Sequence, residues 1–410
     1  MSRSIRRARA AAAACLLALT ATACGVLGGK SGDSAQSLEF WMYQPPTPGA
    51  SQVFEKLRAD FEKANNATVK LVQVPKDDYN TKLASALSGG GGPDAGYLDQ
   101  PLVARYAGDA SIVAVPAGTV NEADYFPGAL ATNRVDGKLF GLPLDHTTIA
   151  LFYNTTLVPD PPRTWDQLRA TATAVHQANP KVAGMVVPKG DGYGAWMWPA
   201  FVASAGGGML DEDNKKVIFD RPPAVDALAL WVDLLASSPR KITDSAKAFE
   251  SGRAAMTISG PWDVSAIEDQ FPDLPYAVAP LPRRDRQASN IGGENVVVFA
   301  GAGNAGLAWK WLAFLTSAQN NAAVAKALGG FATNRAAAAA AKAGEDPSYA
   351  VFLEQLAVAV PRPTVPEWIQ INDEIIAPAL DRALAGKTAP AQSLSDAAAK
   401  TRALLSWPAT

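Results

Sequence analysis

The chain has 410 residues, a formal net charge of −2, two cysteines and only two histidines. Beyond its first nine residues the chain is mildly acidic and lacks basic clusters, so it is a poor candidate for binding nucleic acid or adhering directly to lipid. So few cysteines and histidines also disfavour a zinc site. The length exceeds what one ordinary hydrophobic core requires, so we expect two lobes.

The first 23 residues show the order of features that marks a secretory signal peptide. Four arginines lie among the first nine residues, an apolar run follows at 10–19, and small residues precede Cys24. The apolar run is too short to span a bilayer. Removal of this segment takes away four positive charges and leaves a net charge near −6. Cys15 lies within the apolar run and is removed with the signal peptide, and Cys24 lies at the proposed cleavage site. We therefore expect neither a disulfide nor a thiolate nucleophile in the mature fold.

The next part of the chain alternates predicted strands and helices. Strands are predicted at 38–42, 68–74 and 93–99, with an amphipathic helix after the first and a helix at 77–87 after the second. Strands and helices in this order favour a mostly parallel sheet with helices on both faces.

The middle of the chain continues the pattern. Residues 137–145 lead into the apolar segment 149–154. Thr164 is placed to cap the N-terminus of a helix, and Trp165 is interpreted as a packing residue. Residues 193–208 are rich in aromatic side chains, among them Trp198 before a proline.

The segment 249–264 is the most informative of the chain. A helix end at Gly252 is followed by an apolar strand at 254–258 and then by a Ser-Gly-Pro turn. The turn places Trp262 at the end of the strand, where its side chain can face either a ligand cleft or the core.

The remaining segments add a second glycine turn and several helices. Two glycines lead into a buried strand at 294–299, and a helix at 307–318 carries aromatics that we expect in the core. The alanine run at 336–341 predicts a surface helix. Residues 363–368 open a long helix near the C-terminus and include Trp368.

The blocks 252–264 and 292–299, in their order and spacing, resemble the extracellular solute-binding proteins of carbohydrate ABC importers (family 1, maltose-binding-protein-like). The resemblance extends from residue 38 to about residue 405. It implies an α/β, two-lobed periplasmic-binding-protein fold (type II-like), in which each lobe is a mostly parallel sheet flanked by helices. The lobes are expected to be joined by crossing strands at 144–147 and 295–297, with a third crossing near 329–330. The expected division is a signal peptide at 1–23, a tether at 24–37, an N-lobe at 38–145 and 296–329, and a C-lobe at 146–295 and 330–410.

The resemblance also implies a function. The protein would not be an enzyme and would need no cofactor; it would capture a mono- or disaccharide-sized carbohydrate between its lobes and deliver it to an ABC permease. Residues 19–24 resemble a lipobox, which implies that Cys24 is acylated and anchors a monomeric, exported protein to the outer face of the cytoplasmic membrane.

Candidate ligand-binding residues follow from the chemistry of a sugar, which has apolar faces and a rim of hydroxyl groups. Flat aromatic rings suit the faces, and carboxylates and amides suit the rim. The resemblance implies that the stacking aromatics are Trp262, Trp368 and Trp198. The rim candidates are Asp99, Asp145, Glu294 and Asn295, supported by Tyr43 and Gln44 at the end of the first strand, where open parallel sheets bind ligands, and by Arg335.

Several alternatives stay open at this point. Asp99 and Asp145 are equally suited to capping roles, and Arg335 to an ion pair that holds a lobe. The same fold is also compatible with a glycerophosphodiester, an amino sugar or a polyamine. A secreted glycosidase would need two carboxylates about 5–5.5 Å or 6.5–9.5 Å apart, and the sequence shows no Gly-x-Ser-x-Gly motif for an esterase. A non-transporting sensor or adhesion lipoprotein is the last alternative.

Overall fold

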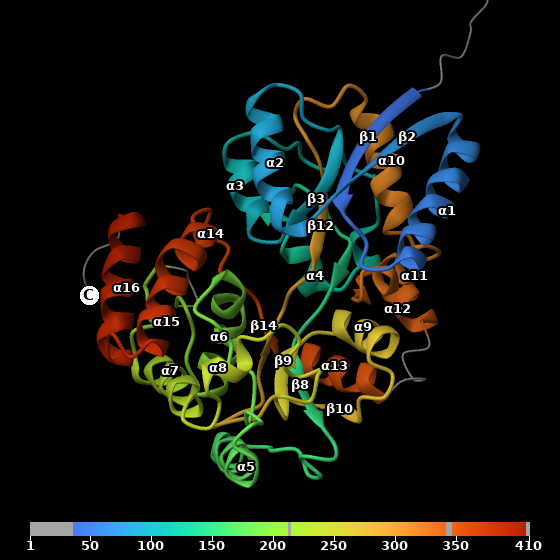
Figure 1. Cartoon of the computed structure of the whole chain (residues 1–410). Coiled ribbons are helices and arrows are strands. Elements are labelled where there is room, and N and C mark those ends of the chain that lie inside the picture. The colour runs from blue at the N-terminus through green and yellow to red at the C-terminus, as the bar shows by residue number, and fades with distance from the viewer. Residues whose placement is uncertain (1–35, 212–214, 342–346, 407–410) are drawn as a thin grey trace, which may run out of the picture. The chain divides into compact units, whose positions relative to one another are not determined.

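The computed structural model describes residues 36–211, 215–341 and 347–406 (Figure 1). The predicted signal peptide, Cys24 and the tether up to residue 35 lie outside these residues. Within them, no helix is both long enough and apolar enough to cross a membrane.

Five strands form the sheet of what we call the first lobe. Their order is β2-β1-β3-β12-β6, with β1 parallel to β2 and β3, and β12 antiparallel to β3 and β6. The strands are β1 (Gln36–Tyr43), β2 (Ala67–Val74), β3 (Ala95–Asp99), β6 (Leu142–Pro143) and β12 (Glu294–Val298).

Helices flank this sheet on both sides, with α2 and α3 opposite α1 and α10 (Figure 1). Phe61 of α1 packs its ring edge-on against Trp311 of α10 at 5.1 Å, and Phe40 of β1 meets Trp311 at 5.9 Å. Trp309 and Trp311 are buried, which confirms that the aromatics of α10 belong to the core. The helices and minor strands of this lobe are α1 (Pro48–Asn65), α2 (Lys76–Ser88), α3 (Leu102–Gly108), η1 (Glu122–Asp124), α4 (Pro127–Ala131), β4 (Arg134–Val135), β5 (Lys138–Leu139), α10 (Ala305–Leu315), α11 (Asn321–Ala327) and α12 (Arg335–Ala340).

The second lobe contains a three-stranded sheet of order β10-β8-β9, made of β8 (Ala150–Asn154), β9 (Met256–Ser259) and β10 (Tyr276–Ala279). Both outer strands are antiparallel to β8, so the expectation of a mostly parallel sheet is wrong for this lobe. The two outer strands therefore run in the same direction, and the sequence pattern predicted only the first of them, β9. It could not predict that β8, about a hundred residues earlier, lies between them and runs the opposite way.

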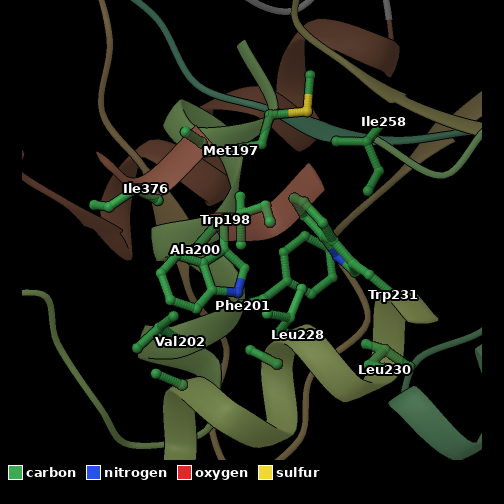
Figure 2. Close-up of a cluster of buried hydrophobic side chains, with 14 of the residues drawn as sticks. Met197, Trp198, Ala200, Phe201, Val202, Leu228, Leu230, Trp231, Ile258 and Ile376 are labelled. Atoms are coloured by element: carbon green, nitrogen blue, oxygen red, sulfur yellow. The ribbon is translucent and has the colours of Figure 1, made fainter. Parts of the chain in front are cut away.

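Helices provide most of the second lobe's core. The rings of Phe201 on α6 and Trp231 on α7 meet edge-on at 5.4 Å, and Trp198 and Ile376 are buried in the same cluster (Figure 2). Thr164 accepts a hydrogen bond from the Gln167 backbone N–H, as expected of an N-cap. The helices are α5 (Trp165–Ala178), α6 (Gly192–Ser204), α7 (Pro222–Leu234), α8 (Arg240–Thr243), α9 (Trp262–Gln270), α13 (Pro347–Ala357), α14 (Trp368–Gln370), the π-helical η2 (Ile371–Ile376), α15 (Ala377–Leu384) and α16 (Pro390–Leu404).

Chain segments that are distant in the sequence lie side by side where the two lobes are linked. β7 (Asp145–His146) pairs with β13 (Phe331–Ala332), and Thr147 forms an antiparallel bridge with Gly292. On the second-lobe side, β11 (Ser289–Asn290) pairs with β14 (Ala359–Val360). We call the segments 144–147, 291–294 and 329–332 the crossing segments. The second crossing was expected at 295–297, but these residues lie within β12 of the first sheet. α12, expected in the C-lobe, packs against α11 of the first lobe; the other lobe boundaries stay a prediction.

Candidate ligand-binding site

Polar side chains gather at one edge of the first sheet. Tyr43, Lys76 and Asp99 lie at or just beyond the carboxyl ends of β1, β2 and β3, while Glu294 begins the antiparallel strand β12. Glu294 is paired in register with Asp99, so the two carboxylates lie on neighbouring strands. We call these four residues the carboxylate edge, and this edge of an open α/β sheet is where ligands bind.

Glu294 is the centre of this edge. Its carboxylate accepts a hydrogen bond of 3.1 Å from the Tyr43 hydroxyl and lies 3.7 Å from Nζ of Lys76. Burial raises the pKa of Glu294 to about 7; the charges of Asp99 and Asp145 act in the same direction, and Lys76 opposes them. A carboxyl group with this pKa changes its charge near neutral pH.

Asp145 supports Glu294 from the crossing segment. Its Oδ1 accepts a 2.9 Å hydrogen bond from the Glu294 backbone N–H, and the residue is only 5% exposed. Burial raises the pKa of Asp145 to about 6. The neighbouring His146 stacks on Phe126 at 5.6 Å, and burial lowers the pKa of His146 to about 4, so it is neutral at physiological pH.

Asp99 is held by a residue that the sequence did not identify. The guanidinium of Arg362 donates two hydrogen bonds to the Asp99 carboxylate, at 2.8 and 2.5 Å. The N-cap of α3 is Pro101, so Asp99 does not cap that helix. Arg362 lies between two prolines and outside any periodic segment, so only its charge in a proline-rich loop could have marked it.

Three aromatic side chains, Tyr193, Trp196 and Trp262, form a second group that we call the aromatic platform. Tyr193 stacks on Trp196 with their ring centroids 5.5 Å apart. The ring centroid of Trp262 lies 6.1 Å from that of Trp196 and 6.5 Å from that of Tyr193. Tyr193 is 47% exposed and both tryptophans are partly exposed. The platform therefore presents aromatic surface that the core does not cover.

The platform lies against the crossing segments. A Cβ at Gly292 would lie 2.8 Å from the Trp196 ring, and a Cβ at Gly329 would lie 2.7 Å from Cα of Trp262. Because Gly292 is two residues before Glu294, the aromatic platform and the carboxylate edge are neighbours. A Cβ at Gly260 would overlap the Trp262 ring, so the glycine of the Ser-Gly-Pro turn allows the ring to fold back over the backbone.

Acidic groups also surround the platform. Asp263 follows Trp262, and its carboxylate accepts a 2.5 Å hydrogen bond from the Ser259 hydroxyl. Burial raises the pKa of Asp263, and burial also raises the pKa of Asp373, with a smaller contribution from the charge of Asp99. Among the residues described here, no group of three or more His, Cys, Asp or Glu side chains could hold a metal ion.

Two predicted aromatic contacts are corrected by the structure. Trp198 is completely buried in the core of the second lobe, and Trp368 is 1% exposed in the same core. The reason for Trp198 is helical geometry: Tyr193 and Trp196 are three residues apart and share a face of α6, whereas Trp198 points to the opposite face. The aromatic-rich sequence identified the helix, but Trp196 is the residue at its exposed face.

A similar correction applies to Asn295. Successive residues of a strand point to opposite faces, so Asn295 points away from the face of Glu294. It is completely buried, and its amide oxygen accepts a 2.7 Å hydrogen bond from Asn133 of the first lobe.

The two remaining candidates are exposed. Among the described residues, Gln44 is held by its backbone N–H, which donates to the Val74 carbonyl at 2.8 Å, and its side chain is exposed. Arg335 is the first residue of α12, after the N-cap Asn334. Within the described part of the chain, no hydrogen bond or ion pair joins Arg335 to the carboxylate edge.

Comparisons with known proteins agree with this architecture. A maltodextrin-binding protein of Bacillus subtilis is 26% identical over 343 residues, which cover 78% of this chain and 79% of that protein. The GacH receptor of Streptomyces glaucescens, solved without ligand and with acarbose and an acarbose homologue, has a TM-score of 0.81 at 25% identity over 91% of this chain and 100% of that one. A solute-binding protein of an ABC transporter from Thermotoga lettingae, bound to α-D-tagatose, has a TM-score of 0.80 at 26% identity over 90% and 100%.

These similarities confirm the predicted two-lobed α/β fold, and the relatives are binding proteins rather than enzymes. The sequence profile that describes bacterial extracellular solute-binding proteins matches residues 56–351. This match covers most of the chain, and the chain therefore belongs to the bacterial extracellular solute-binding protein family.

Proposed function

We propose that the protein captures a carbohydrate of mono- or disaccharide size and delivers it to the permease of an ABC importer. One observation carries this proposal: the partly exposed aromatic platform lies beside the carboxylate edge. A flat aromatic surface fits the C–H face of a sugar ring, and carboxylates accept hydrogen bonds from its hydroxyls, each contributing about 1.5–3 kcal/mol. The relatives that bind a maltodextrin, acarbose or tagatose support the same class of ligand.

Binding is proposed to act through the crossing segments. The carboxylate edge belongs to the first lobe and the aromatic platform to the second, so a ligand that touches both favours the conformation in which they are close. The permease would then recognise surfaces of both lobes in that conformation.

The proposal includes attachment to the membrane through a lipid on Cys24. The lipobox-like sequence at 19–24 supports it. Cys24→Ser should release the protein from the membrane fraction of its host into the soluble fraction. Persistent membrane association of the Cys24→Ser variant would contradict a lipid anchor at this residue.

A thermal-shift screen followed by calorimetry tests the ligand class. The panel should hold mono- and disaccharides, amino sugars, glycerophosphodiesters and polyamines, because a ligand that binds only the native state raises its melting temperature. Trp262→Ala should weaken binding of a sugar by about tenfold or more, which corresponds to 1.4 kcal/mol. Phe271→Leu, at a partly buried aromatic outside the aromatic platform, is the matched control and should leave affinity unchanged.

The same panel decides between the alternatives. A sugar that binds equally well to wild type and Trp262→Ala would contradict the stacking role of the platform. An amine-bearing sugar is the second candidate, because Asp263, Asp373 and Glu294 supply several carboxylates near the platform. A phosphodiester is disfavoured, because the guanidinium of Arg362 is already paired with Asp99. An assay for hydrolysis of the bound disaccharide tests the enzyme alternative, since a binding protein leaves its ligand intact.

A further inference from the structure

One ion pair joins the two lobes directly. Asp99 ends β3 of the first sheet, and the guanidinium of Arg362 donates to both oxygens of its carboxylate, at 2.8 and 2.5 Å. Arg362 is held by the second lobe, because it follows β14, which pairs with β11, and precedes Trp368 in the second-lobe core. Both hydrogen bonds therefore run from one lobe to the other.

The surroundings of this ion pair strengthen it. The Arg362 side chain is 10% exposed and that of Asp99 is 24% exposed, so water screens their attraction less than it screens an ion pair at the surface. Two parallel N–H···O bonds to one carboxylate also fix the relative orientation of the two groups. The other ion pairs among the described residues join side chains of the same lobe. Of these, the pair of Arg402 and Asp220 in the second lobe is the closest in burial, with side chains 18% and 20% exposed.

Gln100 connects the ion pair to the crossing segments. Its amide oxygen accepts a 3.4 Å hydrogen bond from Nη2 of Arg362, and its amide nitrogen donates to the Gly292 carbonyl at 3.2 Å. Gln100 is buried, so both bonds are shielded from water. Because Gly292 lies in the crossing segment 291–294, a change in the angle between the lobes would alter the distance between Arg362 and Asp99.

Two features oppose contact between the lobes beside the ion pair. Nε of Arg362 is buried and has no hydrogen-bond partner among the described residues, and leaving a buried donor unpartnered costs free energy. A cavity of about 420 Å³ also lies here, with walls from Gly128 and Ala131 of the first lobe and from 207–211 and 360–364 of the second. Because the lobes do not pack against each other across this space, burial of apolar surface adds little to their association there. The ion pair is therefore the attraction that favours contact at this point.

We infer that the Asp99–Arg362 ion pair is an interlobe latch, which populates the closed conformation of the unliganded protein and thereby raises its affinity for ligand. Closed here means the conformation in which Arg362 reaches Asp99. The apparent dissociation constant of a ligand that binds this conformation is its intrinsic value divided by the fraction of protein that is closed beforehand. The effect on affinity rests on the proposed function, whereas the effect on the separation of the lobes does not.

Double electron–electron resonance between two spin labels measures that separation without ligand. The labels are attached at Gln52→Cys, exposed on α1, and at Ala174→Cys, exposed on α5, in the Cys24→Ser background. Arg362→Gln should broaden the distance distribution and add a population at a separation that the labelled wild type lacks. Arg362→Lys keeps the charge but not the planar fork of donors, so its distribution should lie between the two. Identical distributions for the labelled wild type and both variants would overturn the latch.

A matched control and a rescue separate the latch from a general loss of stability. Arg402→Gln breaks an ion pair of similar burial that lies within the second lobe, so it should leave the distance distribution unchanged. The double variant Asp99→Arg with Arg362→Asp exchanges the two charges and should restore the wild-type distribution. A double variant with the distribution of Arg362→Gln would show that attraction between these two positions does not set the separation, which contradicts the latch.

Calorimetry with maltose tests the link to affinity. Arg362→Gln should weaken maltose binding about fivefold or more, and Arg402→Gln should bind maltose like wild type. If Arg362→Gln shifts the distance distribution but not the maltose affinity, the latch does not set affinity and that part of the inference is refuted. If maltose binds none of the three proteins, the proposed function fails for this sugar, and the distance distributions still decide whether the latch exists.

Discussion

Replacement of Glu294 by glutamine should stabilise the unliganded protein at alkaline pH. An ordinary glutamate has a pKa of 4.5, whereas burial raises that of Glu294 to about 7. Since one pKa unit corresponds to about 1.4 kcal/mol, ionising Glu294 costs the folded state about 3 kcal/mol relative to the unfolded chain. A glutamine at this position has no charge to bury, and its amide oxygen can still accept the hydrogen bond from Tyr43.

The sign of the pH dependence follows from the raised pKa. Below about pH 4.5 the carboxyl group is protonated in both the folded and the unfolded chain, so it adds no cost there. As the pH rises from about 4.5 to about 7, the unfolded chain releases its proton first, and the free energy of unfolding falls. Glu294→Gln should therefore match wild type near pH 4 and exceed it by up to about 3 kcal/mol near pH 8.

Urea unfolding of both proteins at the two pH values measures this difference. Glu354→Gln, at an exposed glutamate of α13, is the control and should match wild type at both. If Glu294→Gln is less stable than wild type near pH 8, the carboxylate is stabilised by Lys76 and Tyr43 more than burial penalises it, and the reasoning is refuted.

Three further substitutions test other parts of the structure. Gly260→Ala should displace the Trp262 ring, because the added Cβ overlaps it; calorimetry should show a loss of ligand affinity of about tenfold or more, and unchanged affinity would mean that the ring position does not matter. Arg362→Gln should lower the free energy of unfolding by about 2 kcal/mol, because it leaves a partly buried Asp99 charge unpaired. In the Asp99→Asn background the same change should cost clearly less, and additive effects in urea unfolding would show that the ion pair contributes nothing. Thr164→Val should cost about 1 kcal/mol by removing the N-cap of α5; a urea midpoint equal to that of wild type would contradict the capping role.

The sequence predicted the elements of the first lobe because hydrophobic periodicity is a local signal. β1, β2 and β3 all overlap the strands expected at 38–42, 68–74 and 93–99. The family also followed from the sequence, since the blocks around Trp262 and Glu294 lie in the right order. The antiparallel sheet of the second lobe did not follow, because the placement of β8 between β9 and β10 depends on contacts between distant segments.

The site residues were predicted less completely. The sequence does not show which way a side chain points, nor which residues distant along the chain meet in the fold. Trp196 and Trp198 are both in an aromatic-rich helix, and only the position of the core decides which of them is exposed. The same argument separates Glu294 from Asn295 on a strand. The partner of Asp99 could not be read from the sequence at all, because Arg362 is 263 residues away along the chain and no local pattern joins the two.

The order in which the sheet strands are synthesised has a consequence for folding. β12 lies between β3 and β6 in the first sheet, although about 150 residues separate it from β6 along the chain. Until residues 294–298 have been made, β3 and β6 lack their common neighbour and the sheet is left with unpaired edges. Long-range pairing of this kind is slow because loop closure must come before the contacts that reward it. The first lobe can therefore be completed only after residues 294–298 have been synthesised.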